Sequence, residues 1–225
     1  MPTVVASSHD GWAASPLLGT YAGARSHAGD GVGSTNSYDN NGVWHYYASR
    51  RGKYGIRRAF FDFDTTSITV APSAATFKVY GMINGSGDII AVKTNHVTTL
   101  VATTFYDAFD HSPAAQTALD NSDGSGAGTF AGISGLAYSA AIDTWSTSGY
   151  NDIALNATAL ADMASEDTFN ICLMNYDHDY LDVDGTASEQ NGMRFYENGD
   201  GKWPYIDYTA GTAAADNATF FGANF

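Results

Sequence analysis

Alternating hydrophobic and polar positions recur in short segments along this chain, and a period of two is typical of β-strands. The plainest case is 75–82, where a phenylalanine and a valine share one face and a lysine and a tyrosine the other. Residues 56–63, rich in aromatics and followed by the turn-like sequence Asp-Thr-Thr-Ser, predict a strand buried on at least one face. Further strands are expected at 10–14, 88–93, 150–155, 168–174, 192–197 and 203–208.

Turn-forming sequences separate these strands. The sequence Asn-Gly-Ser-Gly at 84–87 predicts a hairpin or meander between the strands on either side of it. Residues 15–49 and 120–135 are rich in small and polar residues and predict surface loops. One short helix is expected at 157–164, because Asn156 is a favourable N-cap for the alanine-rich segment that follows it.

Composition supports the same fold class. The chain is rich in Gly, Ala, Thr, Ser, Asn and Tyr, and its 225 residues suit one β-sandwich with a single core. We therefore expect an all-β domain at 1–209 and a separate tail at 210–225. The tail carries Phe220, Phe221 and Phe225, whose exposure to water is unfavourable, so we expect it to pack on this domain or on a neighbouring subunit.

The charge of the chain is strongly negative and unevenly placed. Ten Lys and Arg stand against 24 Asp and Glu, for a net charge of −14, which disfavours nucleic acid and anionic membranes as partners. Half of the positive residues nevertheless fall within nine positions. This basic band consists of Arg50, Arg51, Lys53, Arg57 and Arg58. In an acidic protein, such a band predicts an interface with an acidic neighbour.

Cysteine content and the N-terminal segment bear on where the protein acts. Cys172 is the only cysteine, so an intrachain disulfide is excluded, and its apolar neighbours predict a buried strand. The first residues lack the charged and apolar regions of a secretion signal, and no apolar run is long enough to span a bilayer. We expect synthesis in a host cytoplasm and action after release, as for virion components.

A series of short motifs resembles a known family. Asp10-Gly11-Trp12 precedes the segment at 58–68, which contains Ala-Phe-Phe-Asp-Phe-Asp, and Ala-Thr-Phe-Lys-Val-Tyr follows at 75–80. This order, continued at 149–156 and 191–209, resembles the core of DNRLRE-type β-sandwiches over roughly residues 10–209. The resemblance implies a jelly-roll sandwich similar to carbohydrate-binding modules and to domains of tailed-phage virion proteins.

The densest group of oxygen ligands lies in one acidic segment near residue 180. It contains Asp177, Asp179, Asp182 and Asp184, with Glu189 just beyond. Hard oxygen donors of this kind suit Ca²⁺, although the spacing does not match an EF-hand loop. The alternative is a solvated acidic loop between two strands, and the sequence indicates no other cofactor.

No motif predicts catalysis. The six histidines lack the local spacing of a zinc site, and no serine lies in a G-x-S-x-G turn. Carboxylate pairs that could hydrolyse a glycosidic bond are expected by chance in so acidic a chain. Aromatic residues are better candidates for function: Trp44, Tyr46 and Tyr47 either stack on sugar rings or an interface, or fill the core. Trp12 and Trp203 are expected in the core.

Together these features predict a non-enzymatic virion structural protein of a tailed phage, either a capsid decoration protein or a subunit of a fibre or appendage. Its partners would be other virion subunits, in a homo-oligomer or a capsid lattice. The expected contacts are the basic band and the phenylalanines of the tail. The alternative is a glycan-binding module that recognises host surface polysaccharide through exposed aromatics, with Trp44, Tyr46 and Tyr47 as candidates, and through acidic side chains, with or without Ca²⁺.

Overall fold

The computed structural model describes residues 1–25, 27, 31–33, 42–96, 100, 133–196 and 200–212, and this part of the chain is mostly β. The strands are β1 Thr3–Val5, β2 Gly11–Ala14, β3 Gly31–Gly33, β4 Gly42–Ala48, β5 Lys53–Asp64, β6 Ala74–Asn84, β7 Ile89–Lys93, β8 Tyr150–Ala154, β9 Thr168–Asn175, β10 Glu189–Met193 and β11 Tyr205–Thr209. The helical segments are α1 Tyr21–Arg25, the 3₁₀ turn η1 Ile133–Leu136, α4 Ala157–Ser165 and the π turn η2 Tyr176–Tyr180. The predicted all-β class is confirmed.

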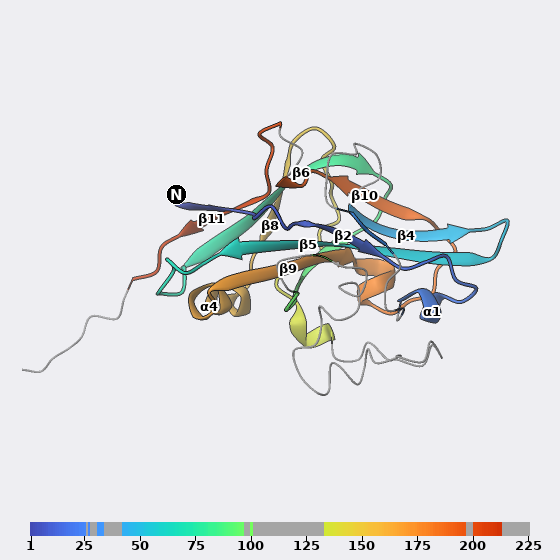
Figure 1. Cartoon of the computed structure of the whole chain (residues 1–225), viewed down its shortest axis with the longest axis horizontal. Helices are drawn as coiled ribbons and strands as arrows, with labels where there is room; N and C mark the ends of the chain where they lie inside the picture. The colour runs from blue at the N-terminus through green and yellow to red at the C-terminus, as the bar shows by residue number, and fades with distance from the viewer. Residues whose placement is uncertain are drawn as a thin grey trace, which may run out of the picture.

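All strand pairs named here are antiparallel, and the strands form two layers (Figure 1). One layer contains β1, β11, β6 and β8. The other contains β7, β9, β5, β2 and β3. Strand β10 pairs with β6 on one side and with β4 on the other, and β4 pairs with β5. Strands β10 and β4 therefore connect the two layers.

The layer around β5 and β9 is buried on both faces. Phe61 and Phe63 of β5 pack against Phe77 of β6 in the core between the layers. Phe60 points the other way, into a second core with Cys172 of β9 and with Tyr21 of α1. Burial on both faces explains why β9 reads as a nearly continuous apolar run. The predicted burial of Cys172 is confirmed.

Several predicted elements are confirmed, among them the helix α4. The Asn156 side chain caps this helix by accepting a hydrogen bond from the backbone N–H of Ala159 at 3.1 Å. The strands at 10–14, 56–63, 75–82, 88–93, 150–155 and 168–174 all form, with small shifts of their ends. The last two predicted strands, at 192–197 and 203–208, are displaced in the structure. Strand β10 ends at Met193, and β11 begins at Tyr205.

Three predictions about local structure are wrong. Residues 84–87 do not make the predicted hairpin or meander, because β6 pairs with β8, β10 and β11, whereas β7 pairs with β9 in the other layer. Residues 42–48 form strand β4 rather than a loop, and β10 and β5 pair with its two edges. Trp203 is 39% exposed and lies outside the core, while Trp12 is half-buried against it.

Within the described ranges, no helix has the length and apolar character needed to cross a membrane.

Candidate functional site

The hairpin of β4 and β5 forms one end of the molecule along its longest axis (Figure 1). Its last pair is Ala48 with Lys53, so residues 49–52 make the turn. Gly52 has φ +54°, a left-handed conformation that glycine adopts without the strain of a Cβ. Arg50, Arg51 and Lys53 are exposed around this turn. Three members of the basic band therefore lie together at the hairpin tip.

A pocket of about 430 Å³ lies beside this tip. It is lined by Leu17, Tyr46, Tyr47, Ala48, Ser49, Arg50 and Arg51. Leu17 is 36% exposed and supplies an apolar wall, and the tyrosines supply aromatic surface. Guanidinium groups next to aromatic and apolar side chains suit a partner that carries an apolar or aromatic group close to a carboxylate. We call this pocket and the exposed Arg50, Arg51 and Lys53 the hairpin site.

Arg57 lies at the root of the hairpin rather than at its tip. Its guanidinium carbon is 4.1 Å from the ring centroid of Trp12 and 5.1 Å from that of Trp44. The Trp44 ring in turn lies 4.6 Å from that of Tyr46, which lines the pocket. Burial lowers the pKa of Arg57 to about 10, so the group stays charged at neutral pH. Arg57 thus joins β2, β4 and β5 through cation–π contacts.

The three aromatic residues predicted to bind a ligand lie in two different environments. Trp44 and Tyr46 are half-buried, and their rings contact each other beside Arg57, which lies over Trp44. Tyr47 also lines the pocket, but its ring packs 4.9 Å from that of Tyr54. The structure therefore brings the aromatic candidates and the basic tip into one region, a proximity that the sequence showed only as adjacency along the chain.

Arg58 has no place in an interface, and its prediction as an interface residue is wrong. Its side chain is fully buried, because alternation along β5 turns position 58 toward the second core. The guanidinium donates to both carboxylate oxygens of Asp179, from Nε at 2.6 Å and from Nη2 at 2.7 Å. Such a two-point ion pair fixes both side chains in one orientation.

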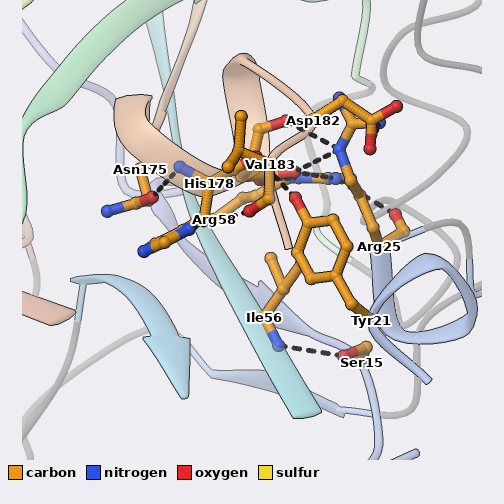
Figure 2. Close-up of polar contacts among 10 residues, drawn as sticks. Ser15, Tyr21, Arg25, Ile56, Arg58, Asn175, His178, Asp182 and Val183 are labelled. Carbon is orange, nitrogen blue, oxygen red and sulfur yellow. Dashed lines mark hydrogen bonds and ion pairs between the residues drawn. The ribbon is translucent and has the colours of Figure 1, made fainter. Parts of the chain in front are cut away.

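A second arginine completes this buried network (Figure 2). Nε of Arg25 donates to the backbone carbonyl of Asp179 at 2.7 Å, and Nη1 lies 2.8 Å from Oδ1 of Asp182. Burial lowers the pKa of Arg25, whereas the charge of Asp179 raises it. Asp182 has φ +58°, a left-handed conformation that Asp tolerates better than most residues. The network joins α1, β5 and η2 beneath the hairpin.

The four acidic residues predicted to hold Ca²⁺ do not converge. Asp179 and Asp182 pair with arginines, Asp177 accepts the backbone N–H of Asp88, and Asp184 accepts a hydrogen bond from Tyr54. In the part of the chain that the structure describes, no group of three or more His, Cys, Asp or Glu side chains could hold a metal ion. The π turn η2 explains the difference, since it turns Asp179 inward and leaves its neighbours elsewhere.

Two histidines distant in sequence stack inside this region. The rings of His45 and His178 have centroids 3.9 Å apart and planes inclined by 28°. His45 is fully buried, and burial together with the neighbouring His178 lowers its pKa to about 4. Nε2 of His178 lies 3.4 Å from Oε1 of Glu189. No local spacing could have indicated this pair, because 133 positions separate its members in the chain.

The remaining predicted contacts, Phe220, Phe221 and Phe225, lie outside the described residues.

Comparison with other proteins adds no family: no protein-family model matches this chain, and no curated protein sequence does so either.

Proposed function

We propose that this chain is a non-enzymatic structural subunit of a tailed-phage virion, a capsid decoration protein or a fibre or appendage subunit, that assembles with its own copies through the hairpin site. The observation that carries the proposal is the exposure of Arg50, Arg51 and Lys53 at one tip of a chain whose net charge is −14. The resemblance to DNRLRE-type jelly-roll sandwiches supports the virion setting.

Charge complementarity favours a second copy as the partner. Because Asp and Glu outnumber Lys and Arg by 24 to 10, most surfaces of another copy are acidic, while the hairpin tip is basic. Opposite charges orient two copies as they approach and disfavour contact between like surfaces. The resulting contact joins the tip of one copy to a different surface of the next, which is a heterologous interface.

The hairpin is also built to act as a rigid contact. The Trp12–Arg57–Trp44 stack braces one face of its root, and the Arg58–Asp179 pair anchors the other. A preorganised surface loses little conformational entropy on binding. The Arg58–Asp179 ion pair is buried below the hairpin. The pocket at the hairpin tip is lined by residues suited to contact with a partner rather than to proton transfer.

Reversing the charge of the tip is expected to abolish self-association. In the variant R50E/R51E, acidic side chains would face the acidic surface of the neighbouring copy, and like charges opposed at a contact are unfavourable. Sedimentation velocity at low ionic strength should show oligomers for the parent chain and monomers for the variant.

Lys202→Glu is the matched control, because the Lys202 side chain is 41% exposed and lies outside the hairpin site. This variant should assemble like the parent chain. Equal assembly by R50E/R51E and the parent would contradict a role for the tip.

Glycan binding is the second candidate, and the observation that favours it is the partly exposed aromatic pair of Trp44 and Tyr46 beside Arg57. Aromatic ring faces pack on the apolar faces of sugars, and a neighbouring arginine would select acidic ones. Titration with oligogalacturonides should then change tryptophan fluorescence, and Trp44→Ala should weaken binding at least tenfold. Absence of saturable binding to these and to neutral oligosaccharides would remove this candidate.

A further inference from the structure

We infer that the pocket of the hairpin site receives the phenylalanine-containing segment 220–225 of a second copy, so that copies join head to tail. This inference rests on the proposed function and names the segment that fills the pocket. It connects the pocket beside the β4–β5 turn with the phenylalanine-containing segment at 220–225 of the sequence.

The pocket and the end of the described chain at residue 212 lie toward opposite ends of the fold. The β4–β5 hairpin lies at one end of the longest axis, and β11 runs toward the other (Figure 1). Strand β5 has 12 residues, which at about 3.3 Å per residue separate the hairpin turn from its far end by about 36 Å. The end of β11 lies beyond that far end of β5 in the same direction (Figure 1).

The tail is too short to bring its first phenylalanines to its own pocket. Eight residues lead from Thr212 to Phe220, and even a fully extended chain covers at most about 3.5 Å per residue, or about 28 Å. That reach is less than the length of β5 alone. A neighbouring copy placed end to end presents its hairpin next to residue 212, where the described chain ends.

The chemistry of the pocket matches that of the segment. Leu17, Tyr46 and Tyr47 offer apolar and aromatic surface to Phe220 and Phe221. Asp216 precedes these phenylalanines by four residues, where its carboxylate can pair with Arg50 or Arg51 at the rim. The volume of about 430 Å³ falls within the roughly 300–1,000 Å³ typical of pockets that enclose a buried group.

A head-to-tail contact has a consequence for assembly. Every copy donates one tail and offers one pocket, so the contact repeats until the copies close into a ring or extend as a filament. A copy that lacks either part can only end a chain.

Mixing two defective full-length variants tests this inference. F220A/F221A/F225A removes the donated rings, and Leu17→Glu places a charge in the apolar wall of the pocket. Each variant alone should be monomeric by light scattering after size exclusion. Their mixture should form a 1:1 complex and nothing larger, because only one working tail and one working pocket remain.

Leu181→Glu is the control for introducing a charge, since Leu181 is 47% exposed and does not line the pocket. It should assemble like the parent chain, and circular dichroism should show that all variants are folded. If F220A/F221A/F225A assembles like the parent while R50E/R51E does not, the tail inference is wrong and the proposed function stands. If the parent chain is itself monomeric, both are wrong.

Discussion

Replacing Asp179 by asparagine is expected to lower the free energy of unfolding by about 3–5 kcal/mol, the usual effect of removing one partner from a buried ion pair. Asp179 and Arg58 are both fully buried, and Arg25 is 3% exposed. Asparagine keeps the shape of the side chain but leaves the guanidinium of Arg58 without a counter-charge in a dry environment. Urea unfolding followed by tryptophan fluorescence measures the change.

Two further variants separate this effect from general sensitivity to mutation. Asp152→Asn breaks the Lys78–Asp152 pair, whose carboxylate side chain is 59% exposed, and should change stability by less than about 1 kcal/mol. The apolar double variant R58M/D179L removes both charges together, so it should be markedly more stable than D179N. A D179N variant as stable as D152N would contradict the anchoring role of the network.

Acidification from pH 6.5 to 5 is expected to destabilise the fold by about 1.6 kcal/mol for each of two buried histidines, because the unfolded imidazole is half protonated at pH 6.5 and almost fully protonated at pH 5. Burial lowers the pKa of His45 to about 4 and that of His96 to about 3, from 6.5 in the unfolded chain. Unfolding therefore takes up a proton at each site in this pH range. The contribution of each histidine is complete about one pH unit above 6.5 and falls as the pH is lowered toward the folded-state pKa.

The histidine contribution can be removed at one site. His45→Phe keeps an aromatic ring against His178 and should reduce the loss of stability between pH 6.5 and 5 by about half. His9→Phe is the control, because the side chain of His9 is 44% exposed. Denaturant melts at the two pH values provide the comparison. A pH dependence unchanged by His45→Phe would show that His45 is not kept neutral by burial.

Sequence periodicity predicted most strands because their side-chain pattern is a local property. The alternation in 75–82 and the apolar run in 168–174 each reflect the core against which the strand packs. Strand pairing is not local, which is why the sequence at 84–87 predicts a hairpin or meander although β6 and β7 belong to different layers. Strand β4 was missed because its aromatic and polar residues face partners far away in the sequence, including β10.

The candidate site was also predictable only in part, because its composition is a local property of the sequence and its geometry is not. A dense basic band beside Trp44, Tyr46 and Tyr47 is visible in the sequence, and the structure places both at one hairpin. The fate of the individual arginines depends on strand alternation and on distant partners. Consecutive Arg57 and Arg58 point to opposite faces of β5, one into an aromatic stack and the other toward Asp179.

This division assigns different tasks to the basic band. Arg57 and Arg58 hold the root of the hairpin, whereas Arg50, Arg51 and Lys53 lie exposed at its tip. Substitutions at the root should act on stability, and those at the tip should act on assembly. Both kinds of positive charge look alike in the sequence, and only their burial separates them.

The most direct test of assembly through the hairpin is the mass of the purified parent chain, measured by light scattering at low and at high ionic strength. We expect oligomers at low salt that dissociate toward the 23.8 kDa chain as salt screens the charges at the tip. A chain that remains monomeric at every salt concentration would contradict the account.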